Sequence, residues 1–406
     1  MKNTKLGLLI LLSLTLIVIP LASACGTTTP PDEELPKEEL KIGAIFALSG
    51  PFSGPLMQLR DGVVACADWI NDNGGLTVQG EQYLIKIIDE DNKLSPDGAI
   101  TAANKLIYQD KVEFMVGPII PFLSAAVAPV TEEANVLRCQ INGVGMPGEL
   151  SPDMTYTFTT FFSRGAVAPT FDYFVEAYPD LNRVALTCPE DPGGLFNMEL
   201  AKEAAEALDL EVVFMEAYPF DTVDFYPLMT SILATNPDAV SMGEGMGPQY
   251  AGIVKAAREL GFTGPLFAYS STGDTEAFRD MIGTDFAYDI FVNDEYLASP
   301  EMPAMVREVE EYIMDKYGQE LTANHLYGWD ALWYMAQAIE AAQSLDPAAV
   351  AATWTAMASL ESVFGASRMG GLETYGINHV VSKVATITRL ENGEIEIVKW
   401  YEMYVP

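Results

Sequence analysis

The sequence predicts an α/β fold made of two doubly wound, Rossmann-like lobes joined by a hinge of three chain crossings. Three observations support this fold class. Short apolar runs alternate with amphipathic helical stretches from Leu40 onward, the alternation occurs in two successive series, and the last third of the chain is too irregular to start a third series. Parallel strands covered by helices on both faces produce this pattern.

The first series opens with the strand "LKIGAIFAL" and continues with "YLIKIID", "EFMVG" and "VLRCQIN". Apolar residues between these runs recur at helical spacing, which predicts helices over about 56–71, 96–108 and 124–134. The second series follows "TYTFTTFF" and contains the strands "RVALTC", "EVVFME", "AVSMG", "PLFAYS" and "YDIFVND". Its helices are expected over about 198–208, 225–234, 250–260 and 275–282.

The remainder of the chain is expected to serve both lobes. Helices after Met302, Asn324 and Pro347 return to the first lobe, and "VVSKVATITRL" and "IEIVKWYEMY" pair in the second. The predicted domains are therefore 40–161 plus 294–378 for lobe 1 and 162–293 plus 379–406 for lobe 2. Several crossings of this kind make a hinge.

The first 24 residues have the layout of a secretory signal peptide. Lys2 and Lys5 precede the apolar span 6–19, and Pro20 and small residues follow it. The span is too short to cross a membrane. The sequence therefore predicts export to the periplasm or to the outer face of the cell membrane.

Cys25 stands directly after this segment, and two interpretations of it remain. Ala22-Ser23-Ala24 fits ordinary cleavage, which would leave a soluble exported protein. The site also resembles a bacterial lipoprotein lipobox, although Ala22 stands where that pattern more often has Leu. We favour acylation of Cys25, in which each buried CH₂ contributes about 0.8 kcal/mol. Residues 25–39, rich in Thr, Pro and acidic side chains, would then form a flexible tether.

The charge balance excludes a role on nucleic acid. The chain has 22 Lys and Arg against 57 Asp and Glu, which gives a formal charge of −35. Removal of the signal peptide takes away two lysines and changes the charge to −37. Few basic groups are present to neutralise phosphates. Charged residues make up only 19% of the chain and hydrophobic residues 49%, so the sequence is globular with an acidic surface.

The remaining cysteines indicate no metal site and no full disulfide framework. Cys66 lies at helical spacing with apolar residues, Cys139 alternates with apolar residues as on a strand, and no C-x-x-C pair occurs. Both are expected in the core. Cys188 ends the apolar run "VALTC" and could face a cleft. One disulfide among the three stays an open alternative.

Sequence motifs of enzymes and of cofactor binding are either missing or lack the flanking secondary structure that they need. Residues 143–148, "GVGMPG", fit G-x-G-x-x-G, but a proline-broken, β-prone segment follows them instead of a helix. His325 and His379 are the two histidines, and neither lies in an H-E-x-x-H motif. Asp89-Glu90-Asp91 lack EF-hand spacing and are expected to form a solvated strand exit. We therefore predict no catalytic residue, no metal and no cofactor.

Glycine and polar residues gather where the predicted strands end, in "LSGPFSGP", "GPIIPFLS", "INGVGMPG", "CPEDPGG", "GEGMGPQ" and "YSSTGDT". In open parallel sheets these carboxyl-end loops line a crevice, and the following helices direct free N–H groups toward it. Two such crevice faces, one on each of two hinged lobes, predict that the lobes close over a small ligand and trap it between them.

The chain resembles the branched-chain amino acid and amide group of ABC-importer solute-binding proteins, the Leu/Ile/Val-binding type, from about Leu40 to Tyr404. The resemblance rests on "IGAIFALSGPFSG", "ADWINDNGG", "SPDGAITAANKLI", "MVGP", "IVKAARELGFTGP" and "YGWDALWYMAQAI" in this order. It implies the type I periplasmic binding protein fold. It also implies a monomeric receptor that delivers solute to a membrane permease.

Departures from the family pattern leave the ligand open. Apolar residues 119–123 replace hydroxyl residues after the third strand, and Gly193 and Gly245 or Met246 stand where relatives place aromatic residues. Ser271 occupies the position of the acid that pairs with a ligand ammonium. Glu190, Asp191 and Glu244 are candidate replacements for that acid, or ordinary strand-exit acids facing water. An amino acid, an amide and an organic or aromatic carboxylate are all compatible ligands.

The predicted ligand-binding residues come from the loops after the strands and from the start of the late helix. They are Phe52, Pro121, Phe122, Ser124, Asn142, Gly143, Gly145, Asp191, Gly193, Glu244, Gly245, Ser271 and Asn324. Asn324 and the nearby Tyr327 have an alternative interpretation as a helix cap and a packing aromatic.

Solute capture for import is the function that we favour. A sensory ectodomain of the same fold is the first alternative, although no membrane helix or signalling domain follows the predicted lobes. An exported hydrolase is the second, and no arrangement of nucleophile and base supports it.

Overall fold

The computed structural model describes residues 38–50 and 53–406. The predicted signal peptide, the lipidation site at Cys25 and the ligand candidate Phe52 lie outside the described residues. The predicted tether ends inside a strand, because β1 begins at Glu38.

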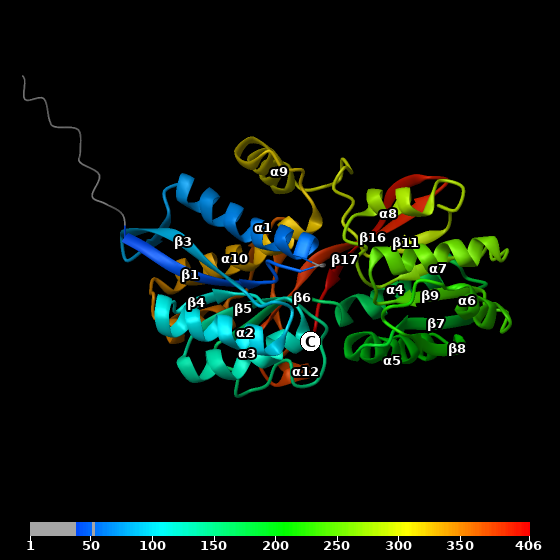
Figure 1. The fold of residues 1–406 in the computed structure, drawn as a ribbon, viewed down its shortest axis with the longest axis horizontal. Helices are drawn as coiled ribbons and strands as arrows, with labels where there is room; N and C mark the ends of the chain where they lie inside the picture. The colour runs from blue at the N-terminus through cyan, green and yellow to red at the C-terminus, as the bar shows by residue number, and fades with distance from the viewer. Residues whose placement is uncertain (1–37, 51–52) are drawn as a thin grey trace, which may run out of the picture. The chain divides into compact units, whose positions relative to one another are not determined.

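The first sheet has the strand order β14-β15-β6-β5-β4-β1-β3-β2. Figure 1 labels the central strands β6, β5, β4, β1 and β3 of this sheet. Neighbouring strands from β15 to β3 run parallel, and β14 and β2 are added antiparallel at the two edges. Its strands are β1 (Glu38–Phe46), β2 (Leu76–Val78), β3 (Glu81–Asp91), β4 (Phe114–Val116), β5 (Leu137–Gly143), β6 (Thr157–Phe162), β14 (Met369–Gly370) and β15 (Val380–Val381).

Helices cover both faces of this sheet, as the alternation along β1 shows. Ile42 and Phe46 pack in the cluster formed with α1 and α10, whereas Ile45 packs in the opposite cluster with α2 and α3. The helical elements of this lobe are α1 (Ser53–Asp72), α2 (Pro96–Lys105), the π-helical turn η1 (Leu106–Asp110), α3 (Pro121–Ala134), α9 (Ala304–Tyr317), α10 (Ala323–Ala342), α11 (Pro347–Ala356) and α12 (Leu372–Tyr375).

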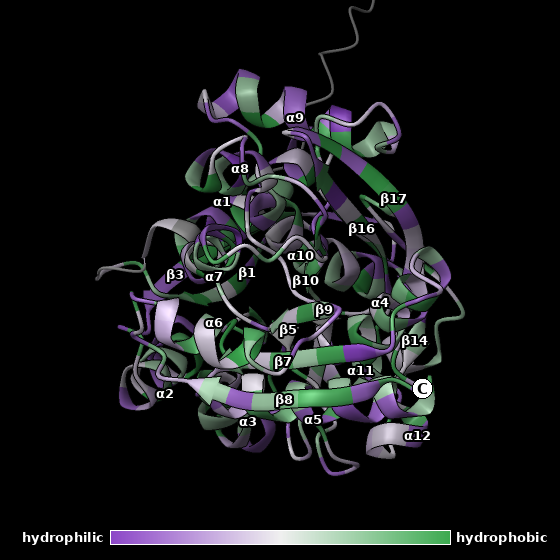
Figure 2. Cartoon of the chain, turned by 90° about the vertical axis from the view of Figure 1, so that its right-hand side faces the viewer, coloured by the Kyte–Doolittle hydropathy of each residue, from purple (hydrophilic) through white to green (hydrophobic). Residues whose placement is uncertain are grey.

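The second sheet has the order β17-β16-β11-β10-β9-β7-β8. Figure 2 shows β7 and β8 side by side, with mostly apolar residues along both strands. As predicted, the two long late strands join this sheet: β16 pairs antiparallel with β11 and with β17. The strands are β7 (Arg183–Pro189), β8 (Glu211–Tyr218), β9 (Ala239–Gly243), β10 (Leu266–Ala268), β11 (Ile290–Val292), β16 (Lys383–Glu391) and β17 (Glu394–Met403).

Helices also cover both faces of the second sheet. Val184 and Leu186 of β7 share a core cluster with α4 and α5, whereas Ala185 packs with α6, α7 and α8. These helices are α4 (Arg164–Ala177), α5 (Pro192–Ala207), α6 (Tyr226–Leu233), α7 (Gly247–Glu259) and α8 (Thr275–Ile282). A separate hairpin joins β12 (Leu360–Ser362) and β13 (Gly365–Ser367).

The chain passes from one sheet to the other three times. The first crossing joins β6 to α4 through Ser163, the second runs from β11 to α9, and the third joins β15 to β16 through Ser382. These crossings and the two sheets confirm the predicted fold class. The exact lobe boundaries stay a prediction.

Four helices, α1, α3, α5 and α7, begin three or more residues earlier than the sequence predicted. α5 begins at Pro192, six residues before the predicted start, because Asp191 accepts hydrogen bonds from Gly193 N (2.9 Å) and Gly194 N (3.1 Å) as an N-cap. α3 likewise begins at Pro121. Glycine and proline made these first turns look like loops.

Cys66 and Cys139 are buried, as expected, and Cys188 is buried as well. All three are free thiols, so none forms a disulfide. No helix follows residues 143–148, which confirms that the G-x-G-x-x-G match opens a loop. Asp89 is not simply solvated, because it pairs with the Arg60 guanidinium.

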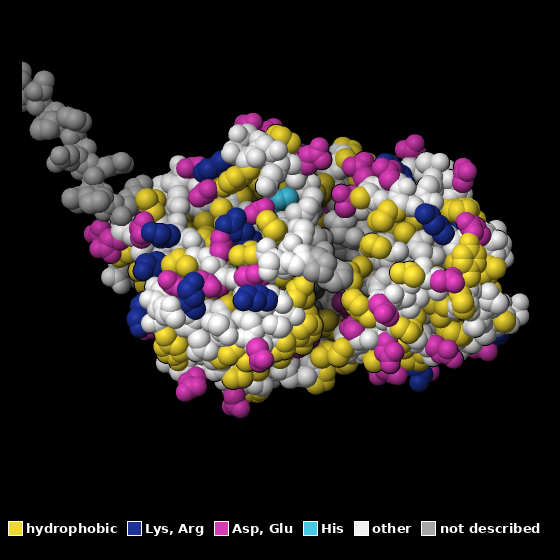
Figure 3. Space-filling view, in the orientation of Figure 1, with side chains coloured by type: hydrophobic (Ala, Val, Ile, Leu, Met, Phe, Trp, Pro, Cys, Tyr) yellow, Lys and Arg dark blue, Asp and Glu magenta, His cyan; other side chains and the backbone are white. Residues whose placement is uncertain are grey.

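Acidic side chains are scattered over the face shown in Figure 3, in keeping with the charge of the chain. None of the helices in the described part of the chain combines the length and apolarity that a bilayer crossing needs.

Candidate functional site

Glu244 lies at the centre of a polar cluster formed by three separate elements. It follows β9, and its Oε2 accepts hydrogen bonds from Ser163 Oγ at 3.1 Å and from the Asn197 side-chain amide. Asn197 Nδ2 also donates to Ser163 Oγ at 2.9 Å. Ser163 belongs to the first crossing and Asn197 to α5, so the cluster joins a sheet exit, a helix and the hinge.

The surroundings of Glu244 make its carboxyl a weak acid. Burial raises the pKa of Glu244 to about 7, although the hydrogen bonds from Asn197 and Ser163 favour the charged form. The neighbouring carboxyl groups of Asp191 and Glu149 raise it further. Near neutral pH this group therefore exists in both protonation states.

Several buried polar atoms beside this carboxyl lack a partner among the described residues. They are Asn197 Oδ1, Tyr218 Oη and Tyr269 Oη. Tyr218 and Tyr269 end or follow strands β8 and β10, and both are at most 3% exposed. Buried polar groups are nearly always hydrogen-bonded, so three open positions in one place favour a bound polar ligand or water.

The loop after β5 brings the first lobe to this cluster. A Cβ on Gly193 would lie 2.9 Å from Val144 Cγ2, so the loop touches the first turn of α5. Glu149 fixes the loop by accepting from Gly145 N at 3.1 Å, and Arg164 donates to Gly145 O at 3.1 Å. Burial raises the pKa of Glu149.

The structure thus gathers the predicted residues Gly145, Asp191, Gly193, Glu244 and Gly245. Asn142 and Gly143 lie at the end of β5, at the start of the same loop. Gly245 N donates to Tyr250 Oη at 2.6 Å. Asp191 is already engaged as the cap of α5. Glu244 is therefore the acid of this group that is best placed for a ligand.

Ser271 has a different partner from the one expected. Its hydroxyl donates to Asp294, which also accepts from Thr272 N at 2.9 Å and Thr275 Oγ1 at 3.1 Å. Asp294 is 2% exposed, and its burial raises the pKa. Asp294 was not among the predicted ligand-binding residues, although an acid two residues after the apolar run "IFV" was a usable signal.

The remaining candidates lie in other local networks. Ser124 is buried and accepts from Arg138 Nη1 at 2.6 Å, and Asn324 Nδ2 donates to Gln58 Oε1 at 3.1 Å. Pro121 begins α3, and the adjacent Phe122 is exposed. These contacts engage the Ser124 hydroxyl and the Asn324 side-chain nitrogen within the first lobe.

A second buried acid missed by the sequence analysis lies at the hinge. Glu295 pairs with Lys383 Nζ at 2.7 Å and accepts from Tyr327 Oη at 2.5 Å. Glu295 belongs to the second crossing, and Lys383 begins the strand after the third. Tyr327 therefore packs against the hinge.

In the described ranges, 38–50 and 53–406, no group of three or more His, Cys, Asp or Glu side chains is arranged to hold a metal ion. The acids around Glu244 are held by neutral donors instead.

Comparison with known proteins gives the family. The model of the family described as "Periplasmic binding protein" matches residues 39–394. An amino acid binding protein of Pseudomonas aeruginosa is 24% identical over 79% of this chain and 84% of its own length. The Leu/Ile/Val-binding protein BraC3 of Rhizobium johnstonii is 26% identical over 66% of this chain and 71% of its own.

Solved structures confirm the fold. The branched-chain amino acid binding protein LivJ of Streptococcus pneumoniae, in complex with isoleucine, gives a TM-score of 0.74 at 20% identity and covers 90% of this chain and all of its own. A solute-binding protein of R. palustris in complex with 4-hydroxybenzoate gives a TM-score of 0.73 at 19% identity and covers 90% of this chain and 97% of its own. The family match, the names of the relatives and the shared type I fold confirm the resemblance seen in the sequence, and the chain belongs to the periplasmic binding protein family.

Proposed function

We propose that this protein is an extracytoplasmic solute-binding lipoprotein that captures a small organic solute between its two lobes and delivers it to an ABC-type import permease. It acts as a monomer and binds its solute without changing it. Family membership and the three-crossing hinge support this function. Similar proteins are named for binding amino acids, isoleucine or 4-hydroxybenzoate.

The polar cluster around Glu244 favours a solute with an ammonium or other N–H donor group. Glu244, Asp191 and Glu149 place three carboxyl groups near one another, with Arg164 as a neighbouring cation. Asn197 Oδ1 is a buried acceptor that meets no donor within 38–50 and 53–406. A carboxylate facing these acids would be repelled, whereas an ammonium would pair with Glu244. We therefore propose an amino acid or an amine-bearing relative as the solute class.

A thermal-shift screen of amino acids, amides and aromatic acids against the mature domain tests this function. A ligand at 1,000 times its dissociation constant adds roughly 4 kcal/mol of stability. Stabilisation by amine-bearing compounds is the expected result. Stabilisation by aromatic acids alone would contradict the proposed solute class, and stabilisation by none of the three classes would count against solute capture.

Replacing Glu244 with Gln should weaken binding of the identified amine by about 2 to 5 kcal/mol, because an amide cannot neutralise the ammonium. The wild-type affinity should rise from pH 6 to pH 8 as Glu244 loses its proton, and the variant should lose this pH dependence. Titration calorimetry measures both effects. The exposed neighbour Glu190→Gln is the matched control and should bind like the wild type.

Acylation of Cys25 is the proposed means of retention at the membrane. The Cys25→Ser variant should move from the membrane fraction to the soluble fraction when host cells are fractionated, because it lacks the acceptor thiol. A variant that stays with the membrane would contradict the anchor and leave solute binding untouched.

A further inference from the structure

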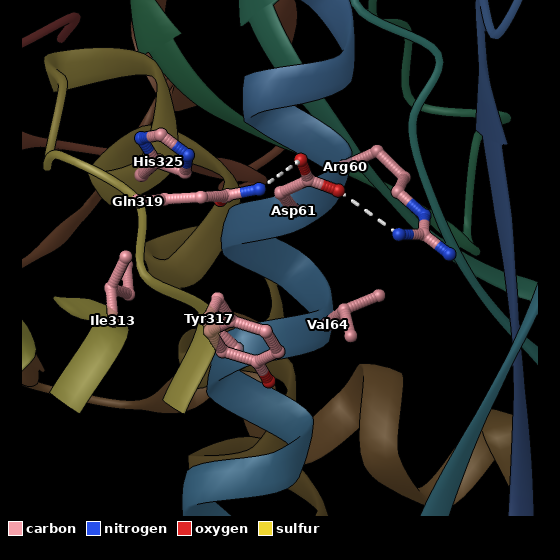
Figure 4. Close-up of a pocket in the computed structure, with 8 residues that line it drawn as sticks. Arg60, Asp61, Val64, Ile313, Tyr317, Gln319 and His325 are labelled. Carbon is pink, nitrogen blue, oxygen red and sulfur yellow. Dashed lines mark hydrogen bonds and ion pairs between the residues drawn. The ribbon is translucent and has the colours of Figure 1, made fainter. Parts of the chain in front are cut away.

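A cavity of about 140 Å³ lies in the first lobe between α1, α9 and the start of α10 (Figure 4). It shares no residue with the cluster around Glu244. Its polar lining consists of Arg60, Asp61, Gln319 and His325, and its apolar wall includes Val64, Ala65, Ile313 and the ring of Tyr317. One side of the cavity is therefore polar and the other apolar.

His325 lines this cavity and carries a ring nitrogen without a partner in the described part of the chain. Its Nδ1 accepts the Thr322 N–H at 3.1 Å, so the neutral ring carries its proton on Nε2. Burial lowers the pKa of His325 and keeps the ring neutral. The residue is 3% exposed, and Nε2 has no hydrogen-bond partner among the described residues. A buried N–H without an acceptor is costly, so this position favours a ligand that accepts a hydrogen bond.

Asp61 supplies an acceptor near the same edge. Its Oδ1 accepts from Arg60 Nη1 at 3.0 Å, and its Oδ2 lies 3.5 Å from Gln319 Nε2 (Figure 4). The carboxylate is close enough to favour the protonated form of His325. Asp61 and His325 line the same cavity because α1 and α10 touch at Gly62, where a Cβ would lie 1.9 Å from His325 O.

We propose that this cavity is a second ligand site, which takes a small ring compound carrying a hydroxyl group, such as a phenol. The hydroxyl oxygen accepts from His325 Nε2–H and its proton is donated to Asp61, since one hydroxyl both accepts and donates. The ring packs against Val64 and Ile313. The size fits, because a cavity of about 150 Å³ holds a benzene molecule.

Other ligand classes satisfy fewer of these groups. A carboxylate would be repelled, because Arg60 is the one cation among the described residues of the lining and already pairs with two carboxylates, Asp61 and Asp89. An ammonium offers no lone pair to His325. A ring without a polar group would leave the Nε2–H unsatisfied. The hydroxyl is therefore the group that this pair of side chains selects.

Nuclear magnetic resonance of the imidazole rings tests the site, because the chain has two histidines. The His325 signals, assigned by their loss in His325→Gln, should shift saturably when phenol is added to the labelled mature domain. The His379 signals should not shift, because both its ring nitrogens are already hydrogen-bonded. Toluene at the same concentration is the probe without a hydroxyl. No shift with phenol, or an equal shift with toluene, would overturn the proposal.

Variants of the lining provide the second measurement. Val64→Phe fills the cavity and should raise the apparent dissociation constant of phenol at least tenfold, whereas Val223→Phe, at a residue 92% exposed, should leave it unchanged. Asp61→Ala retains His325 and the cavity but removes the acceptor, and should also weaken phenol binding. Unchanged binding in both lining variants would overturn the site.

Discussion

At the scale of single residues, buried carboxyl groups make the stability of this protein depend on pH. Asp330 of α10 is 5% exposed, and burial raises its pKa to about 7. Val363 N donates to Asp330 Oδ1 at 2.9 Å, and the positive charge of Lys383 favours ionisation, but neither offsets the burial. Between pH 3.8 and about 7, Asp330 is therefore mostly protonated in the folded chain and mostly ionised in the unfolded chain.

This difference predicts a loss of stability as the pH rises. The folded-state pKa is raised, so the contribution of Asp330 is complete below its unfolded value of 3.8 and is lost as the pH approaches 7. Between pH 5 and pH 8 the free energy of unfolding of the wild type should decrease by about 2 kcal/mol more than that of Asp330→Asn. The asparagine keeps an acceptor for Val363 N. Urea denaturation at the two pH values measures the difference.

The exposed Asp315→Asn is the matched control for this prediction. Its stability should follow the wild type across the same range. If the curves of Asp330→Asn and the wild type run parallel, Asp330 is not neutral in the folded protein.

At the scale of helices and strands, two glycines bring α1 and α10 into contact along their length (Figure 1). A Cβ on Gly62 would lie 1.9 Å from His325 O, and one on Gly328 would lie 1.9 Å from Leu59 O. Neither glycine has a positive φ. Glycine is required at both positions because the two helix backbones approach each other closely. This contact also places the cavity between the helices.

The Gly62→Ala variant should therefore destabilise the protein by at least about 2 kcal/mol, because the methyl group must push the two backbones apart. Gly54→Ala in the same helix is the control, since no described heavy atom lies within 4 Å of its Cβ position. Alanine favours helix over glycine, so the control should be neutral or more stable by up to about 1 kcal/mol. Guanidinium denaturation of both variants distinguishes them, and equal effects would show that the helices do not touch at Gly62.

At the scale of the whole molecule, the segments that cross between the sheets carry buried polar contacts. Ser163 of the first crossing holds Glu244, and Glu295 of the second pairs with Lys383 beyond the third. Both members of this ion pair are at most 6% exposed. Tyr327 extends the network to α10 and lies with its ring centre 4.2 Å from Lys383 Nζ.

Removing one member of this pair should be costly, because the other charge is left buried. Lys383→Met should lower the free energy of unfolding by about 3 to 5 kcal/mol. Lys86→Met breaks an exposed ion pair with Glu39 and should cost at most about 1 kcal/mol. Thermal and urea denaturation of the two variants make the comparison. Adding Glu295→Gln to Lys383→Met should restore part of the loss, and no recovery would show that charge pairing is not the cause.

Much of the fold was predictable, because each lobe is built from local patterns. The strands of both sheets occur within one to three residues of most predicted bounds, since apolar runs and helical spacing report burial directly. The first turn of α5 was missed at Asp191-Pro192, although an Asp before a Pro is a usual helix start. Local sequence also identified Glu244 as a candidate acid.

By itself, the sequence determined the two series of strands and helices, the acidic charge and the loops where polar residues gather, because these depend on neighbouring residues. Only the tertiary structure decided the partners of those polar residues. Glu244 meets Ser163 and Asn197, which lie 81 and 47 positions away, and Ser271 meets Asp294, which lies 23 positions away. The ionisation of a carboxyl depends on such distant groups and on burial, and chain folding brings them together.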